Sequence, residues 1–324
     1  MRMLLLVAAC AAALQSTSSV NAQIYPTRPI TMVVAASAGG PTDAIARILG
    51  EHLRVSLGQP FVIENVSGAA GTIGIGRVAR AAPDGATISI GQWSQYVVNP
   101  AVYQLPYDVL KDFEPVGLIS TAPQLIVARK TFPANNLNEL IAWLRASPDK
   151  ATAAIGGIGS PVHIFGLLFQ KLTGTQFQFV PYRGAGPALQ AVVAGQIDVM
   201  FDLAANSLPQ VHGGTIKAYA VTSNTRLAAA PDVPTVDEAG LPGFYASVWH
   251  AIWVPKGTPK DVIAKLNAAV VEALDDPTVR KRLADLGQDI FPREQRTPEA
   301  LGAFHRAEIE KWWPIIKASG LKIE

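Results

Sequence analysis

The sequence predicts an α/β protein with mostly parallel sheets, built from about two domains. Patterns typical of strands alternate with helical patterns along almost the whole chain, which favours layered α/β architecture. The length of 324 residues suggests two domains. Hydrophobic residues make up 49% of the chain and charged residues only 16%, so a globular fold with an ample core is expected.

Composition excludes several classes of function. The net charge is +2 and there is no basic run, so we expect no nucleic-acid partner. Cys10 is the only cysteine, and it lies in a segment that we expect to be removed. The mature chain would then lack disulfides, thiolate chemistry and cysteine metal sites. No two of the five histidines have the spacing of metal ligands, so we expect no metal site. The chain has neither a dinucleotide fingerprint nor a Gly-Lys-Ser/Thr phosphate loop, and we expect no cofactor.

Residues 1–22 have the features of a secretory signal peptide. Arg2 provides the basic start, a short apolar stretch follows, and Val20-Asn21-Ala22 is a small-residue cleavage site before Gln23. A lipoprotein processing site ending at Cys10 is a weaker match. No later segment is long and apolar enough to span a bilayer. We therefore expect a soluble mature protein in the periplasm.

The first unit of the mature chain is a strand, a small-residue turn and a helix. The apolar run that begins at Ile30 fits a buried parallel strand. Gly39 and Gly40 permit a tight turn, and Pro41 suits the first turn of a helix. Free N–H groups at such a helix start can bind an anion. For a single turn of this kind, a purely structural role is the simpler interpretation.

Further strands and helices follow in alternation. Strands are expected at 61–65, 87–91, 113–119, 124–128, 151–155, 176–181, 196–201 and 216–222, with a return crossing at 244–255. Helices are expected at 75–82, 137–146, 162–172, 188–194, 259–274, 277–286 and 298–319. Asn136 is the expected N-cap of the helix 137–146. The joint 120–123, between two strands, is the first candidate hinge.

A second turn of similar design, with Gly157 and Gly159, runs from Gly156 to His163. Two such loops facing each other across a cleft would form a clamp for a ligand. Ser160 and His163 could alternatively serve as nucleophile and base of a hydrolase. However, the sequence around Ser160 is not the Gly-x-Ser-x-Gly elbow, and an N-cap serine followed by a helical histidine is the simpler interpretation.

Other candidate residues have two interpretations each. Asp43 and Asp202 lie near the expected cleft and could form an acid/base pair, although Asp43 also suits the first turn of a helix. Trp93 and Ser94 lie on an expected loop, so Trp93 is a better pocket candidate than the strand tryptophans. Arg183 could contact a ligand carboxylate or be a solvated loop arginine.

Motifs along nearly the whole mature chain match one family. The matching stretches are 25–30, Gly39-Gly40-Pro41-Thr42-Asp43 with 44–47, 64–65, 71–74, 82–85, 112–113, 157–163, 180–184, 220–223 and 231–240. In these stretches the chain resembles the Bug family of periplasmic solute receptors, the extracytoplasmic binding proteins of tripartite tricarboxylate transporters.

The resemblance implies a Venus-flytrap fold of two α/β domains joined by two crossing strands that act as a hinge. It implies domain 1 at 23–121 plus 247–324, and domain 2 at 122–246. The ligand would lie between the loops 37–43 and 157–163, often with ordered water and no charged side chain. The family often has Pro-Phe-x-x-Gly-Gly at the first loop. Here the sequence is Val34-Ala35-Ala36-Ser37-Ala38-Gly39-Gly40, which leaves specificity open.

The expected function is a periplasmic receptor for a small carboxylate, working as a monomer with membrane transporter subunits or a signalling partner. The expected ligand-binding residues are Ser37, Ala38, Gly39, Gly40, Asp43, Trp93, Ser94, Gly157, Gly159, Ser160, His163, Arg183 and Asp202. No catalytic or metal-binding residue is expected. The competing hypothesis is a secreted hydrolase that uses Ser160 and His163.

Overall fold

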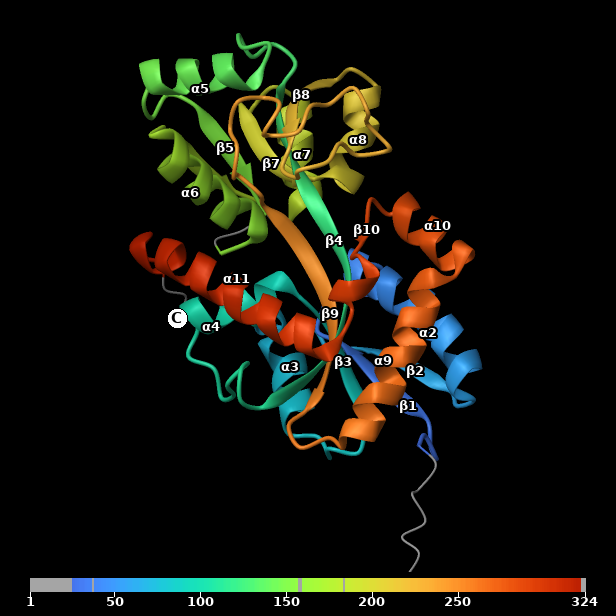
Figure 1. Ribbon diagram of the computed structural model, residues 1–324. Coiled ribbons are helices and arrows are strands. Elements are labelled where there is room, and N and C mark those ends of the chain that lie inside the picture. The colour runs from blue at the N-terminus through green and yellow to red at the C-terminus, as the bar shows by residue number, and fades with distance from the viewer. Residues whose placement is uncertain (1–24, 37, 157–158, 183, 322–324) are drawn as a thin grey trace, which may run out of the picture.

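The computed structural model describes residues 25–36, 38–156, 159–182 and 184–321. The expected signal peptide and the candidate site residues Ser37, Gly157 and Arg183 lie outside these ranges. The chain forms two lobes, an upper and a lower one in Figure 1, and two long strands run between them. These are β4 (Phe113–Arg129) and β9 (Ser247–Pro255). Among the described residues, no helix is long and apolar enough to cross a membrane.

Each lobe combines a sheet with flanking helices (Figure 1). The lower lobe contains strands β1 (Ile30–Val34), β2 (Phe61–Asn65), β3 (Thr87–Gln92) and β10 (Asp289–Ile290), and helices α2 (Pro41–Leu57), α3 (Thr72–Ala79), α4 (Asn99–Val102), α9 (Lys260–Asp275), α10 (Pro277–Asp285) and α11 (Pro298–Ala318). The upper lobe contains strands β5 (Thr152–Ile155), β6 (Gln178–Pro181), β7 (Val199–Leu203) and β8 (Ile216–Val221), and helices α5 (Leu137–Ala146), α6 (Pro161–Thr173), α7 (Ala185–Val193) and α8 (Ala204–His212). The helical turns η1 (Ala69–Gly71), η2 (Ser94–Val98) and η3 (Arg293–Gln295) belong to the lower lobe.

The sheets are mixed, which corrects the expectation of mostly parallel strands. β1 is parallel to β2 and β3, and β5 is parallel to β6 and β7. The crossing strands pair antiparallel with each other, β9 with β3, and β4 with both β7 and β8. The reason is topological: one crossing strand carries the chain out of the lower lobe and the other brings it back. Strand–helix alternation predicts only the parallel part.

The expected break at 120–123 is absent, because β4 is one continuous strand of 17 residues. Thr121, Ala122 and Pro123 pair with β9, and the register shifts between Leu118 and Ser120. Such an irregularity bends a strand pair without ending it. β10 adds a short third strand here, since Asp289 pairs with Thr121. The crossing is therefore a narrow three-stranded ribbon at this level.

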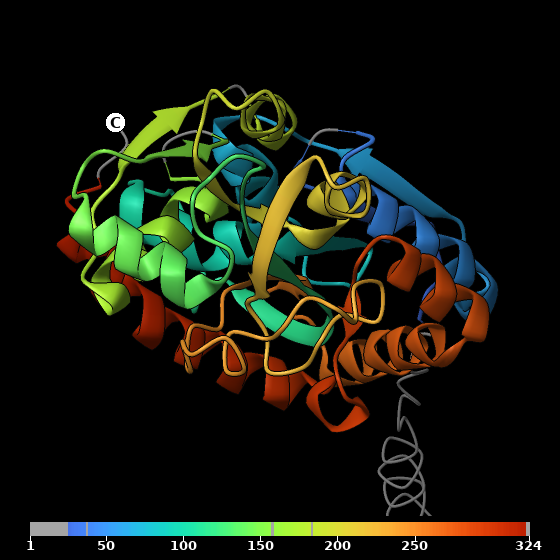
Figure 2. The ribbon, with the colours of Figure 1, turned by 90° about the horizontal axis from the view of Figure 1, so that it is seen from above.

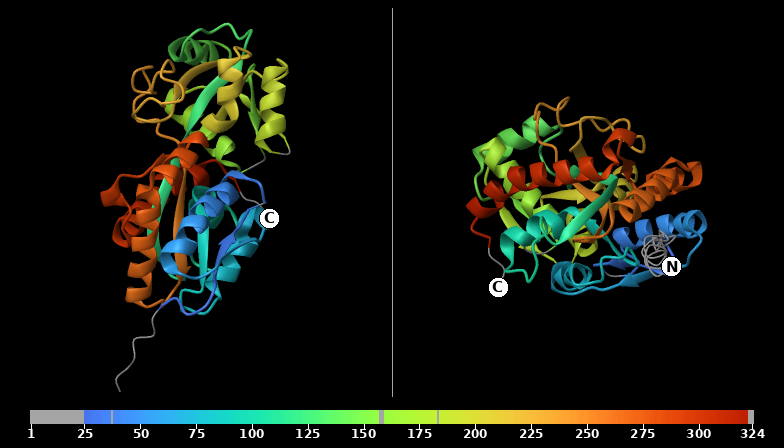
Figure 3. Two further views of the ribbon diagram at one scale, coloured as in Figure 1. Left: turned by 90° about the vertical axis from the view of Figure 1, so that its right-hand side faces the viewer. Right: turned by 60° about the horizontal axis from the view of Figure 1, so that its bottom comes forward.

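The hydrophobic core runs from one lobe into the other where α11 lies against the upper lobe. One cluster of buried side chains packs α2 and α9 against the lower sheet. The other cluster contains residues of the upper lobe together with Trp93 and residues of α11. Viewed from above, α11 (red) extends beneath the helices of the upper lobe (Figure 2). In side view, the N-terminal end of α2 points towards the junction of the lobes (Figure 3).

Candidate functional site

A cleft of about 400 Å³ lies between the two lobes. Its walls come from the ends of β1 and β3, the turn around η1, the turn η2 with α4, and the start of α6. The lining residues are Ala35, Ala36, Ser67, Gly68, Ala70, Gly71, Gln92, Ser94, Gln95, Asn99, Val102, Tyr103, Gly156, Gly159, Ser160 and Pro161. None of these described lining residues carries a charged side chain. Of the candidate residues, Ser94, Gly159 and Ser160 are part of this wall.

The first loop connects β1 to α2 and is held by its own helix. Gly40 is the extended N-cap and Pro41 the first helical residue. Gly39 has a φ of +78°, a backbone angle that favours glycine. Its N–H donates to Oδ2 of Asp43 at 2.8 Å. The N–H of Gly39, which we expected to serve the ligand, is thus already satisfied within the loop.

Asp43 is buried and has several donors around it. Arg47 Nε donates to its Oδ2 at 3.0 Å, and Asn65 Nδ2 donates to its Oδ1 at 3.0 Å. Burial acts to raise the pKa of Asp43, but the hydrogen bonds from Arg47, Gly39 and Asn65 outweigh it and lower the pKa. Asn65 Nδ2 also reaches the Ala36 carbonyl at 3.3 Å. Asp43 therefore supports the loop from behind and is absent from the cleft wall.

The second loop connects β5 to α6 and repeats this design in the upper lobe. Ser160 is the N-cap, as the sequence predicted, and Oγ accepts the His163 N–H at 3.4 Å. Gly159 has a φ of +77°. Its N–H donates to Nδ1 of His163 at 3.1 Å.

The bond from Gly159 fixes the protonation of His163. Since Nδ1 accepts, the ring proton of the neutral imidazole lies on Nε2. Burial lowers the pKa of His163 to about 4, so the ring is neutral near pH 7. The ring packs edge-on against Phe179, at 4.6 Å between centroids. Nδ1 is not available as a base for Ser160, because it already accepts the Gly159 N–H.

Side-chain amides set the lower wall of the cleft. Gln95 Nε2 donates to the Ala35 carbonyl at 2.8 Å, and its Oε1 accepts the Gln92 N–H at 3.1 Å. Asn99 Nδ2 donates to the Ala70 carbonyl at 3.0 Å. Together they order two loops that face the cleft.

Gly71 lets these loops pack closely. A Cβ atom at this position would lie 2.6 Å from the Ala35 carbonyl oxygen. Gly71 is not among the ligand-binding residues expected from the sequence. The position of Gly71 after the second strand could have indicated a place at the site, because ligands bind beyond the carboxyl ends of parallel strands.

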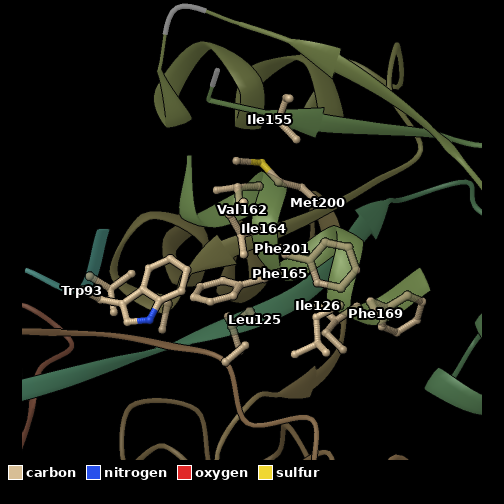
Figure 4. Packing of buried hydrophobic residues seen from close by; sticks show 14 of the residues in the cluster. Trp93, Leu125, Ile126, Ile155, Val162, Ile164, Phe165, Phe169, Met200 and Phe201 are labelled. Carbon is tan, nitrogen blue, oxygen red and sulfur yellow. The ribbon is translucent and has the colours of Figure 1, made fainter. Parts of the chain in front are cut away.

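The expectation that Trp93 lines the pocket is wrong. Its side chain is completely buried and packs against Phe165, with ring centroids 4.9 Å apart (Figure 4). It also packs against Trp312, with centroids 5.0 Å apart. The backbone turns into η2 directly after Trp93, so Ser94 faces the cleft while the indole enters the core. Burial of the large indole decides its orientation.

Asp202 also lies away from the cleft wall. It sits in β7 rather than after a strand, and its side chain is completely buried. Oδ2 accepts hydrogen bonds from Asn206 at 2.7 Å and Ser207 at 2.6 Å, at the start of α8. Asp43 and Asp202 belong to different lobes, and each accepts hydrogen bonds from residues of its own lobe. Ala38, Gly39 and Gly40 belong to the first loop but are not among the wall residues.

Two α/β lobes, two crossing strands and an uncharged cleft between the lobes define a two-lobed solute-binding protein. The chain belongs to the tripartite tricarboxylate transporter receptor family, whose model, "Tripartite tricarboxylate transporter family receptor", matches residues 45–321. The family match and the similarity to the solved structures of MatC and BugD confirm the resemblance to Bug receptors and the flytrap fold.

Solved structures of three proteins are similar over most of the chain. MatC from Rhodopseudomonas palustris, with bound malate, is 42% identical, with a TM-score of 0.77 over 90% of this chain and 100% of that one. The periplasmic binding protein BugD is 40% identical, with a TM-score of 0.77 over 93% of this chain and 100% of that one. A second R. palustris protein, with adipate, is 32% identical, with a TM-score of 0.79 over 92% of this chain and 99% of that one.

Proposed function

We propose that this protein is a periplasmic receptor that captures a small carboxylate in the cleft between its lobes. The observation that carries the proposal is the composition of the cleft wall. Its described residues are mostly small or polar, and none has a charged side chain. Malate in MatC and adipate in the second R. palustris structure are both dicarboxylates. The volume of about 400 Å³ suits a ligand of this size.

An uncharged cleft can bind an anion through helix ends and neutral donors. α6 begins in the wall with Ser160 and Pro161, so the positive end of its dipole lies at the cleft. The Ser160 oxygen accepts the capping bond, and its hydroxyl proton remains able to donate to a ligand oxygen. Hydrogen bonds to a charged acceptor contribute roughly 1.5–3 kcal/mol each, so a few suffice for useful affinity.

The family to which the chain belongs supports a proposal for the partner and the location. We propose that a signal peptide is cleaved before Gln23, that the monomeric receptor works in the periplasm, and that it delivers its ligand to transporter subunits or to a signalling partner. The proposed domains are 23–121 plus 247–324, and 122–246, with β4 and β9 as the hinge. Because His163 Nδ1 is engaged by Gly159, we propose a receptor without hydrolase activity.

A thermal-shift screen against organic acids tests the ligand class. Mature protein is titrated with malate, adipate and their monomethyl esters, followed by calorimetry. A ligand at 100 times its Kd adds about 2.7 kcal/mol to the free energy of unfolding. We expect the diacids to stabilise the protein and the monoesters to lose most of the affinity. Equal binding of acid and ester, or turnover of generic esters, would contradict the proposal.

The N-terminus is tested by intact-mass spectrometry of protein isolated from the periplasm. We expect a mass that begins at Gln23. An acylated Cys10 at the N-terminus would show that the chain is processed as a lipoprotein.

A further inference from the structure

We propose that Asp43 and His163 are positioning residues that shape the two ligand loops without touching the ligand. Each accepts the N–H of the left-handed glycine four residues before it, and each lies on the first turn of the helix that follows the loop. The inference rests on the proposed function, because it takes the cleft to be the ligand-binding site. It changes the role of two residues that sequence reasoning counted as ligand contacts.

The two lobes use the same geometry with different acceptors. Gly39 and Gly159 have φ angles of +78° and +77°. Their N–H groups donate at 2.8 Å to a carboxylate oxygen and at 3.1 Å to an imidazole nitrogen, respectively. A proline at the first helical position follows in both loops. Two unrelated acceptors at one structural position indicate that the required property is acceptance of the glycine N–H.

Burial and charge argue against direct ligand contact. Both side chains are buried, and neither belongs to the cleft wall. An unpaired carboxylate at Asp43 would repel an anionic ligand, but Arg47 lies against Oδ2 and Asn65 against Oδ1. The negative charge is thus compensated behind the loop.

Two substitutions at position 163 separate positioning from packing. His163→Asn keeps a neutral acceptor, and the shorter Asp43 shows that a side chain of this length reaches the glycine N–H from the same helical position. His163→Leu keeps the bulk and removes the acceptor. His212→Asn, on the exposed end of α8, is the matched control elsewhere in the upper lobe.

We expect calorimetric titration with malate or adipate, whichever binds more tightly, to show about tenfold weaker affinity for His163→Leu and a change of less than about threefold for His163→Asn. Amide hydrogen exchange at Gly159 in the ligand-free proteins should be faster in His163→Leu only. Equal losses of affinity in both variants would mean that the imidazole itself contacts the ligand. Unchanged Gly159 exchange in His163→Leu would overturn the positioning role.

The lower lobe gives a second test. We expect Asp43→Ala to accelerate amide exchange at Gly39 and to weaken binding by about tenfold, with the thermal midpoint measured alongside to confirm folding. A tighter affinity for the diacid in Asp43→Ala would show that the carboxylate faces the ligand, and would overturn the proposal. If the wild-type protein binds no acid, the proposed function fails, while the exchange at Gly39 and Gly159 still decides the positioning role.

Discussion

The indole of Trp93 in the lower lobe lies 4.9 Å from the phenyl ring of Phe165 in the upper lobe, and both rings are completely buried (Figure 4). Trp312 of α11 packs against both, at 5.0 and 5.3 Å. This aromatic cluster lies next to the cleft, since Ser94 follows Trp93 directly and Ser160 precedes Phe165 by roughly one and a half helical turns. A buried apolar contact between lobes resists their separation. We therefore expect cleft opening to be limited on this side.

Phe165→Ala should loosen the two lobes. Truncating a buried phenylalanine costs about 3–5 kcal/mol of folding free energy. Part of the lost packing energy stabilises the contact between the lobes. We therefore expect small-angle X-ray scattering to show a larger radius of gyration for the ligand-free variant. Phe165→Leu is the milder variant if the alanine protein is too unstable.

Phe132→Ala is the matched control for that experiment. Phe132 is also buried, but it packs against Trp143 within the upper lobe, at 4.9 Å between centroids. It should destabilise the protein by a similar amount and leave the radius of gyration unchanged. Identical scattering profiles for both variants would mean that the aromatic cluster does not hold the lobes together.

Ser160→Ala should weaken ligand binding by about tenfold, because a hydroxyl donor to a charged oxygen is removed. The same change removes the N-cap of α6 and should cost about 1 kcal/mol of stability. Asn136→Ala removes the N-cap of α5 far from the cleft and serves as the control. Calorimetry should show a loss of affinity for Ser160→Ala alone. Equal affinities would exclude the hydroxyl as a ligand contact.

Stability should fall as the pH drops from about 6.5 towards 4. Burial lowers the pKa values of His163, His250 and His305 to about 4 each, from 6.5. Between these values the unfolded chain binds more protons than the folded one, so acid favours unfolding. Chemical denaturation from pH 7.5 to 4.5 should show this slope, and His163→Asn should reduce it. A flat profile would contradict the depressed pKa values.

The Asp202 carboxyl should make stability depend on pH in the opposite sense to the buried histidines, and Asp202→Asn should remove this contribution. Burial raises the pKa of Asp202 from 3.8 to about 6, so between these values the folded protein holds a proton that the unfolded chain has lost. Stability should therefore fall as the pH rises from about 4 to 6 and stay level above that. The asparagine oxygen can still accept from Asn206 and Ser207. We expect the variant to gain on the order of 2–3 kcal/mol relative to wild type between pH 4 and pH 8. A stability difference that is independent of pH would exclude this ionisation.

Local patterns in the sequence predicted the turns around the site well. The glycine–proline turns before α2 and α6, the Ser160 cap and the Asn136 cap are all present. Each depends on a backbone angle or a hydrogen bond between residues at most four apart. The continuous strand β4 was missed because Pro123 and its small neighbours indicate a turn, whereas pairing with β9 keeps them extended.

By itself the sequence determined the α/β class and the two loops, because periodicity, glycine angles and helix caps are local properties. The likeness to solute receptors came from motifs that resemble one family. Only the tertiary structure decided which polar groups face the cleft. Trp93 and Asp202 turned inward, while Gln95 and Asn99 came to support the wall. The N–H groups of Gly39 and Gly159 were taken by Asp43 and His163. Burial and hydrogen-bond satisfaction depend on neighbours that the fold brings together, and these neighbours determine the role of each side chain.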